Sequence, residues 1–342
     1  MNEVSRRGWC GWSVASILGA SCRRGPPADP TVFTGPDFSI EPMERRELVT
    51  AILRALDDKY VFPEIAARNR PELERRWSES ALQEVTSARK LTEKINADLR
   101  RLFRDKHVFL RPARSMPMIF DDREPTEVEL ADLAMLEAPG HFGVARVEVV
   151  SGGIGVLELD HFPLVKVPGM EQAASDAMAA VADANALVVD LRRNGGGDGD
   201  TVSLFLSYLF DEPKLLNETY DRIANVKTAQ WTRAEVRGKR YTKGPVFVLT
   251  SRHTFSAGEG FAYAVQTLKR GTVVGETTGG GGHHNTFVKV GKEFVLSVAF
   301  TVSKSPVTGT NWDGVGAKPD VVANADDAFD IALKMAASAA RK

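Results

Sequence analysis

The sequence predicts an α/β domain with a largely parallel sheet, which follows a smaller helical unit. Two patterns support this fold class. Beyond about residue 144, short runs rich in Val and Leu alternate with helix-like stretches, which is typical of strands connected by helices. Between about residues 41 and 111, apolar residues instead recur at the spacing of amphipathic helices. The length of 342 residues allows one large domain and a second, smaller one.

Residues 1–21 have the pattern of an export signal. The Arg6 and Arg7 pair resembles a twin-arginine signal, and a short apolar stretch follows it. Small residues before Cys22 resemble a lipoprotein processing site, although Gly19 replaces the usual leucine. Because the apolar stretch is too short to span a bilayer, we expect no transmembrane segment in the mature chain. We expect an exported protein, periplasmic or lipid-anchored to the cell envelope; a disordered basic leader is the alternative.

The chain between this signal and the α/β region divides into two parts. Residues 22–40 contain four prolines and are expected to form a linker. Residues 41–115 form the predicted N-terminal helical domain. Within it, the stretches 41–62 and 91–107 place leucine and isoleucine at helical spacing, so each predicts an amphipathic helix.

Residues 116–342 form the predicted α/β core. Its expected strands lie at residues 145–150, 153–160, 186–191, 246–250, 272–276 and 293–300. Its expected helices lie at residues 170–184, 200–210 and 256–270. Because helices separate several of these strands, neighbouring strands can run parallel. No Rossmann or phosphate-loop glycine pattern follows a strand, so nucleotide binding is not supported.

The composition excludes several kinds of partner. The formal net charge is -1 with both signs intermixed, so neither nucleic acid nor an acidic membrane surface is expected to bind. Both cysteines, Cys10 and Cys22, lie near the N-terminus, so the body has no disulfide and no thiolate metal site. The six histidines lack a ligand spacing such as HExxH, so we expect no metal and no organic cofactor. The expected partner is a peptide or a small molecule.

Three glycine-rich turns follow predicted strands, and the first lies at Gly195–Gly197. Glycines there let the backbone approach a ligand closely and turn its N–H groups outward at a helix start. Such groups can bind a developing oxyanion, whereas a flexible turn is the alternative interpretation. Asp198 and Asp200 beyond it are equally well explained as acids of a first helical turn.

The second turn contains Ser256, which lies where a buried run of Val, Phe and Leu meets a predicted helix. Enzymes of acyl transfer often hold a nucleophilic serine at such a junction. Taken alone, however, Ser256 is better explained as a helix N-cap that accepts an N–H from Gly258 or Glu259. The surrounding residues do not match the GxSxG pattern. For Glu259, we expect a structural role at the positive end of the helix dipole.

The third turn combines a run of four glycines, residues 279–282, with the two histidines that follow it. It occupies residues 273–284 and ends in His283 and His284. A mobile hairpin tip and a wall of the same pocket are the two open interpretations.

Taken together, the turns are more specific than any one of them. The chain resembles the tail-specific, or C-terminal processing, serine peptidase family, in the branch of the tricorn core protease and interphotoreceptor retinoid-binding protein. The resemblance covers roughly residues 42–335. It rests on "GGIGVLELDHF", "ALVVDLRRNGGG", "TSRHTFSAGEGFAYAVQTLKR", "TVVGETTGGGGHH" and "NWDGVGAKPDV", and on "DDKYVFPE" and "DKHVFL" in the helical unit.

This resemblance implies a crotonase-like (ClpP-like) peptidase core with a small N-terminal helical domain. It implies that Ser256 is the nucleophile and that the oxyanion hole uses N–H groups of Ala257 and of the Gly195–Gly196 turn. Many family members carry a PDZ domain between the helical region and the core. Only about 40 residues separate His107 from the strand that contains Ile154, so we expect no PDZ domain here.

The resemblance also directs the search for the base. The best-known family members use a lysine in a loop resembling "GETTGGGG", and here that position is Gly281. Lys269 is a poor substitute, because 13 residues of helix place it about 20 Å from the helix start. The tricorn-like branch instead implies a histidine far upstream, which is His107 here. Histidine suits this role because its ordinary pKa lies near neutrality.

An acidic third member is implied at Asp313, where the branch carries a glutamate. Alternative interpretations remain for each of these residues. Asp313 also suits an Asp-Gly turn, His107 also suits a surface loop, and His283 is a rival base or a residue of the substrate loop.

The sequence therefore predicts a serine-type peptidase that hydrolyses peptide or protein substrates through an acyl-enzyme with a Ser256/His107/Asp313 triad. One alternative is a carrier of a hydrophobic, retinoid- or lipid-like ligand on the same fold. The other is an inactive protein that binds peptide tails at a sheet edge. The sequence predicts neither the cleavage preference nor the oligomeric state.

Overall fold

The computed structural model describes residues 31–33, 35–115 and 124–341. The expected export signal and the lipidation site at Cys22 lie outside these residues, as does most of the expected linker. No helix within the described ranges is long and apolar enough to cross a membrane.

A six-stranded sheet forms the core, and its strands follow the order β11-β8-β7-β4-β3-β2. All neighbouring pairs run parallel except β2 with β3. The strands are β2 (Val144–Val150), β3 (Ile154–Leu159), β4 (Ala186–Asp190), β7 (Val246–Thr250), β8 (Thr272–Gly275) and β11 (Val321–Val322). β4 and β7 are buried along their whole length, as expected for central parallel strands. The predicted α/β fold with a largely parallel sheet is confirmed.

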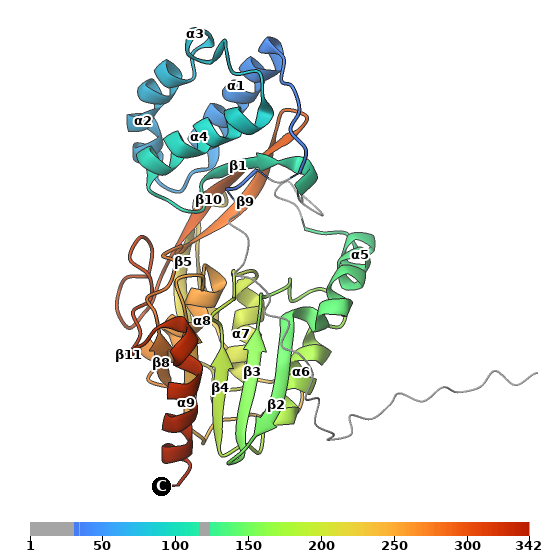
Figure 1. The fold of residues 1–342 in the computed structure, drawn as a ribbon, viewed down its shortest axis with the longest axis vertical. Helices are drawn as coiled ribbons and strands as arrows, with labels where there is room; N and C mark the ends of the chain where they lie inside the picture. Colours follow the sequence, from blue (N-terminus) through green and yellow to red (C-terminus); the bar gives the residue numbers. More distant parts are fainter. Residues whose placement is uncertain (1–30, 34, 116–123, 342) are drawn as a thin grey trace, which may run out of the picture.

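Helices cover both faces of this sheet (Figure 1). α6 (Met170–Val181), α7 (Gly199–Ser207) and α8 (Ala257–Thr267) pack on one face. α9 (Ala325–Ala339) packs on the other face through Ala328, Ala332 and Ala336, which are fully buried. Their small side chains let the helix approach Val188 and Leu249 of the sheet closely.

A second, antiparallel sheet has the strand order β1-β10-β5-β6, with β9 also paired to β10. Its strands are β1 (Phe109–Pro112), β5 (Leu215–Asp221), β6 (Val226–Trp231), β9 (His283–Val290) and β10 (Phe294–Lys304). The stretch 293–300, expected among the core strands, belongs to this sheet as β10. The reason is that no helix separates β9 from β10, so the chain returns as a hairpin and the strands run antiparallel.

The helical unit packs against this second sheet. It consists of α1 (Pro42–Lys59), α2 (Pro63–Arg76), α3 (Glu79–Leu82) and α4 (Ala88–Phe103). Ile52 and Leu99 lie in the same buried cluster as Leu296 and Val298 of β10. Figure 1 shows β9 and β10 extending from the core toward these helices. The hairpin therefore joins the helical unit to the core.

Two local features bring distant residues to one place. α4 ends at Phe103, and the left-handed conformation of its C-cap Arg104 (φ 58°) turns the chain into the loop that carries His107. β1 follows directly and pairs with β10, with Phe109 opposite Ser297. Described residues between β1 and β2 form only η1 (Ala113–Ser115), α5 (Glu127–Glu137) and η2 (Ala138–Gly143), and no PDZ domain is found there.

Candidate active site

Ser256 lies in a tight turn between β7 and α8. Its backbone has φ 52° and ψ -119°, a region that non-glycine residues rarely occupy and that is strained. Phe255 anchors the turn, because its N–H donates to the carbonyl of Asn194 at 2.9 Å and its carbonyl accepts the N–H of Gly258 at 2.9 Å. Gly258 is therefore not the partner of the expected Ser256 cap. Ser256 instead forms a capping box with Glu259, in which the side chain of each residue accepts the backbone N–H of the other. Strain of this kind concentrates at functional sites.

The His107 side chain meets Ser256, although 149 residues separate them in sequence. Its Nε2 lies 3.1 Å from Ser256 Oγ. The ring is 3% exposed and lies 5.0 Å from the Phe255 ring, and Ser297 Oγ donates to the His107 carbonyl. Within the described chain, His107 Nδ1 is buried and has no hydrogen-bond partner. The arrangement is that of a serine hydroxyl and a proton acceptor.

Burial lowers the pKa of His107 to about 4, and the carboxylate of Asp105 only partly opposes this effect. The imidazole is therefore neutral at pH 7. A neutral imidazole can accept a proton from a hydroxyl at 3.1 Å.

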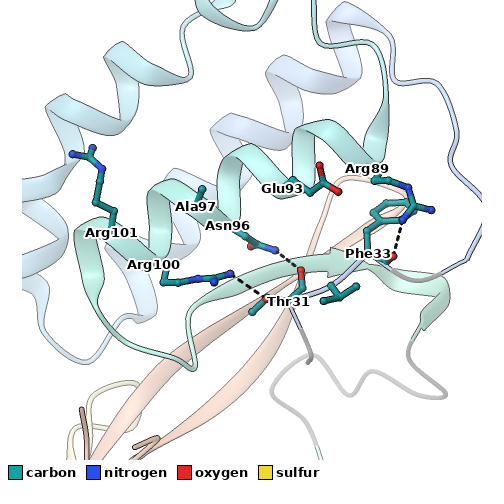
Figure 2. Close-up of a pocket in the computed structure, with 9 residues that line it drawn as sticks. Thr31, Phe33, Arg89, Glu93, Asn96, Ala97, Arg100 and Arg101 are labelled. Carbon is teal, nitrogen blue, oxygen red and sulfur yellow. Dashed lines mark hydrogen bonds between the residues drawn. The ribbon is translucent and has the colours of Figure 1, made fainter. Parts of the chain in front are cut away.

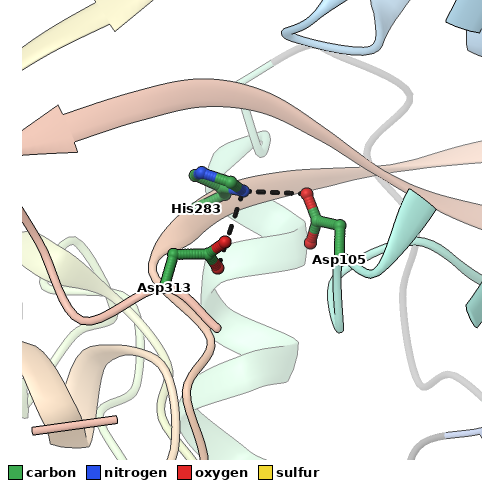
Figure 3. Close-up of side chains that lie close together, drawn as sticks. All are labelled: Asp105, His283 and Asp313. Carbon is green, nitrogen blue, oxygen red and sulfur yellow. Dashed lines mark hydrogen bonds and ion pairs between the residues drawn. The ribbon is translucent and has the colours of Figure 1, made fainter. Parts of the chain in front are cut away.

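A second histidine, His283, lies between two carboxylates, those of Asp105 and Asp313 (Figure 3). His283 Nδ1 is 2.8 Å from Asp105 Oδ2 and 3.7 Å from Asp313 Oδ1. Asp313 Oδ1 also accepts the N–H of Gly282 at 2.9 Å. The structure thus places Asp313 against His283, and the expected hydrogen bond from Asp313 to His107 is not formed. His283 itself has no recorded contact with Ser256.

Burial and charge act in opposite directions on this pair. Burial favours a lower pKa for His283, but the hydrogen bond and charge of Asp105 outweigh it and raise the pKa. Burial likewise favours a higher pKa for Asp105, but His283 holds it below the ordinary value. Both shifts favour the charged form of each group, as in a charge-assisted hydrogen bond between them.

Asp105, His283 and Asp313 also have the composition of a metal site. Their ligand atoms lie within 4.8 Å of one another, the one such group found in the described ranges. The atoms are already engaged, however. Asp105 Oδ2 and His283 Nδ1 share a hydrogen bond, and Asp313 Oδ1 accepts from Gly282. Because a cation would have to displace the shared proton, we assign no metal here.

The first glycine-rich turn lies directly against Ser256. Gly196 has φ 106°, and a Cβ on it would lie 2.8 Å from Ser256 Cβ and 3.3 Å from the backbone nitrogen of Ala257. The expected N–H donors are nevertheless occupied: Gly195 N–H donates to the Asp160 carbonyl at 3.3 Å, and Gly196 N–H donates to Asn194 Oδ1 at 2.9 Å. The Ala257 N–H, at the first position of α8, has no hydrogen-bond acceptor among the described residues.

Asn194 is a site residue that the sequence did not single out. It is fully buried, and its side-chain amide donates to the Leu159 carbonyl at 3.0 Å. It thereby fixes the end of β3, the glycine turn and the Phe255 backbone to one another. An asparagine directly before three glycines was the available signal, since a polar residue in a tight turn usually bonds to the backbone.

Glu259 is fully buried and connects the second turn to the third. Its carboxylate accepts the N–H groups of Ser256 at 2.8 Å, Gly280 at 2.6 Å and Gly281 at 2.8 Å, and the hydroxyl of Thr278. Its position in the first turn of α8 agrees with the expected structural role. The sequence did not reveal that it also holds the glycine-rich loop over the site.

Replacing Glu259 with glutamine tests the burial of this carboxylate. Burial raises the pKa of Glu259 from 4.5 to about 7, so the folded protein binds this proton more tightly than the unfolded chain does. The resulting contribution to the free energy of unfolding is fully present below about pH 4.5 and is lost as the pH rises through 7. Glu259→Gln lacks this titration. Relative to wild type, its free energy of unfolding should therefore gain about 2 kcal/mol between pH 5 and pH 8. Urea unfolding measures this gain, with exposed Glu47→Gln as control; an unchanged difference contradicts it.

A pocket of about 610 Å³ lies away from Ser256, on the helical unit (Figure 2). Its lining includes Arg89, Arg100 and Arg101 of α4. Arg89 donates to the Phe33 carbonyl at 2.9 Å, and Arg100 donates to Thr31 Oγ1 at 3.2 Å. The pocket wall therefore combines guanidinium groups with the apolar Phe33 side chain, and neither Ser256 nor His107 lines it.

Two family models match the chain. The model of peptidase family S41 matches residues 153–323, half of the sequence. The model described as the N-terminal domain of peptidase S41 in eukaryotic IRBP matches residues 43–138. The first range contains Ser256, His283 and Asp313, and the second contains His107.

Curated relatives match over part of their length. The tail-specific protease of Haemophilus influenzae is 31% identical over 163 residues, which are 47% of this chain and 21% of that protein. The carboxy-terminal-processing protease of Bartonella bacilliformis is 26% identical over 182 residues, 51% of this chain and 39% of that protein. The matched part of this chain thus spans well under half of either relative.

Solved structures match over most of the chain. A putative peptidase from Parabacteroides merdae has a TM-score of 0.58 at 17% identity, covering 85% of this chain and 96% of that one. The tricorn protease has a TM-score of 0.56 at 13% identity, covering 87% of this chain and 37% of that one. At these identities the likeness shows the fold, and the predicted peptidase-type core with its helical N-terminal part is confirmed.

Proposed function

Because this chain belongs to peptidase family S41, we propose that it is a serine peptidase that hydrolyses peptide bonds through an acyl-enzyme on Ser256. The observation that carries this proposal is the 3.1 Å approach of His107 Nε2 to the hydroxyl of Ser256 in a strained turn. A peptide or protein is the substrate, and the chemistry needs no cofactor.

The geometry supports a conventional order of proton transfers. Ser256 Oγ attacks the peptide carbonyl carbon while His107 Nε2 takes its proton. The tetrahedral intermediate then collapses, and His107 returns the proton to the leaving amine. Water attacks the acyl-enzyme with His107 again as base, which releases the carboxylic acid and restores Ser256.

We assign the oxyanion to the N–H of Ala257 and to the glycine turn at 195–197. The Ala257 N–H is the stronger candidate, because it lies at the positive end of α8 and has no recorded acceptor. Gly196 would contribute by sharing its N–H between Asn194 Oδ1 and the oxyanion. The Gly195 N–H would likewise have to be shared between the Asp160 carbonyl and the oxyanion.

Of the two candidate bases, the geometry favours His107. His283 Nδ1 is engaged by Asp105, whereas His107 Nε2 lies 3.1 Å from Ser256 Oγ. In this proposal Asp313 is the acidic residue that acts on the site indirectly, through its contact with His283. A carrier of hydrophobic ligands remains the second candidate, since residues 43–138 match a domain model named after IRBP.

A fluorophosphonate probe tests the peptidase proposal, because it reacts only with an activated serine. We expect wild type to be labelled at Ser256, as located by peptide mapping. Ser256→Ala should not be labelled, His107→Ala should be labelled at least about 100-fold more slowly, and the exposed Ser151→Ala should match wild type. A folded wild type that resists the probe, or reacts elsewhere, would overturn the mechanism and favour the carrier.

The location of the protein is a separate proposal. We infer from residues 1–21 that the chain is exported to the cell envelope. Mass spectrometry of the protein purified from its own cells should find an N-terminus at or near Cys22. A mature protein that begins at Met1 would contradict export by cleavage.

A further inference from the structure

The base of the proposed peptidase lacks a direct acidic partner on its ring. His107 Nδ1 is buried without a hydrogen bond in the described chain. During catalysis His107 becomes an imidazolium, and a buried cation is costly unless a negative charge lies near it. The acid expected for this purpose, Asp313, contacts His283 instead. Another group must therefore supply the charge.

Asp105 is placed to do so. It precedes His107 by two residues and is 3% exposed. Its Oδ1 accepts the backbone N–H of His107 at 2.8 Å, which fixes the base at its main chain. Its Oδ2 is held by His283 Nδ1 at 2.8 Å and by the Tyr60 hydroxyl at 3.4 Å. The carboxylate is thus held from three sides.

Two carboxylates, Asp105 and Asp313, flank one imidazole, that of His283. Burial raises the pKa of Asp313, whereas His283 holds the pKa of Asp105 below its ordinary value although burial opposes this. Asp105 is therefore the carboxylate that places a negative charge beside the buried base. The Phe62 ring packs against the His283 ring at 5.3 Å, which helps to keep water away from the Asp105–His283 pair.

We propose that Asp105, clamped by His283, is the positioning residue that holds His107 and stabilises its imidazolium, while Asp313 acts only on His283. This inference rests on the proposed function, in which His107 is the base. It gives Asp105 the supporting role that the sequence implied for Asp313. It also makes His283 a part of the support and removes it as a rival base.

The groups that act on these charges are few. Asp105, His283 and His284 influence the pKa of His107, and Tyr60, Asp313 and Lys106 surround the rest of the cluster. Asp105 raises the pKa of His107, whereas His283 lowers it. Removing each charge alone should therefore move the His107 titration in opposite directions.

The experiment measures the His107 titration by NMR of its ring carbon and proton, in a Ser256→Ala background so that it needs no activity. Asp105→Asn keeps the shape and an acceptor for the His107 N–H but removes the charge, so the His107 pKa should fall. His283→Asn keeps a donor near Asp105 but removes the positive charge, so the pKa should rise. Asp313→Asn should change it much less than Asp105→Asn, and His161→Asn is the matched control.

Kinetics with Ser256 present add a second measurement. Asp105→Asn should lower kcat about 100-fold with little change in KM, and Asp313→Asn less than about 10-fold. The acid limb of kcat/KM should follow the NMR shifts.

Equal shifts of the His107 pKa for Asp105→Asn and His283→Asn, or a dominant effect of Asp313→Asn, would overturn the inference. If Asp105→Asn fails to fold, the upward shift in His283→Asn and the small effect of Asp313→Asn decide it. Absence of labelling at Ser256 would instead refute the peptidase proposal alone.

Discussion

Ser256→Ala, His107→Ala and the double variant are all expected to lose the same activity, with kcat for peptide hydrolysis falling on the order of 10⁶-fold. The reason is that attack and proton removal form one step, joined by the 3.1 Å contact between Oγ and Nε2. Without the base the hydroxyl is a weak nucleophile, and without the hydroxyl the base has no proton to take. A fluorogenic peptide assay on the three purified variants measures this equality.

Two results would contradict this prediction. Single losses that multiply in the double variant would show that the two side chains act independently. Substantial activity in His107→Ala would place the base elsewhere. His107→Ala/His283→Ala would then show whether His283 had replaced it. A trace of contaminating protease is recognised because Ser256→Ala would retain the same trace.

Gly281→Ala is expected to lower kcat by at least about 100-fold while the protein stays folded. A Cβ at this position would lie 2.8 Å from His107 Cε1 and would overlap the ring of Phe255. Backbone strain is not the cause, because Gly281 has no left-handed φ. The added methyl group instead displaces the base from Ser256, and a shift of about 1 Å suffices for such a loss.

The matched control is Gly140→Ala, since a Cβ there meets no atom within 4 Å and Gly140 also lacks a left-handed φ. Thermal unfolding should show a cost of about 1–3 kcal/mol for Gly281→Ala, as for other overpacked sites. Gly281→Ala/Phe255→Leu should recover part of the activity by making room for the methyl group. Wild-type activity in Gly281→Ala would contradict the prediction, because it would mean that His107 can be displaced without loss of kcat.

The sequence was most informative where local pattern and burial agree. The apolar runs at 186–190 and 246–250 are strands buried on both faces, so their composition alone identified them. The strand-to-helix junction at Ser256 was visible for the same reason. No local pattern predicted the pairing of Ser256 with His107. That prediction followed from the family resemblance.

The missed features depend on contacts between distant segments. Asp105 and His283 are 178 residues apart, and only the packing of the β9–β10 hairpin on the helical unit brings them together. Asp313 contacts His283 rather than its expected partner His107, and this too could not be seen in the sequence. α2 was not distinguished as a separate helix within the helical region, and it contains Pro71. Neither periodicity nor motif spacing carries information about such contacts.

The close approach of Gly281 to His107 has a consequence for which residue can act as the base. Gly281 stands where the resemblance to Ser–Lys peptidases leads one to expect a lysine, and a Cβ there would meet the rings of both Phe255 and His107. In this chain a side chain at 281 and the ring at 107 would compete for the same space, so a lysine at 281 could act as the base only if the rings of Phe255 and His107 were displaced. A single substitution at 281 would therefore not exchange one proton acceptor for the other.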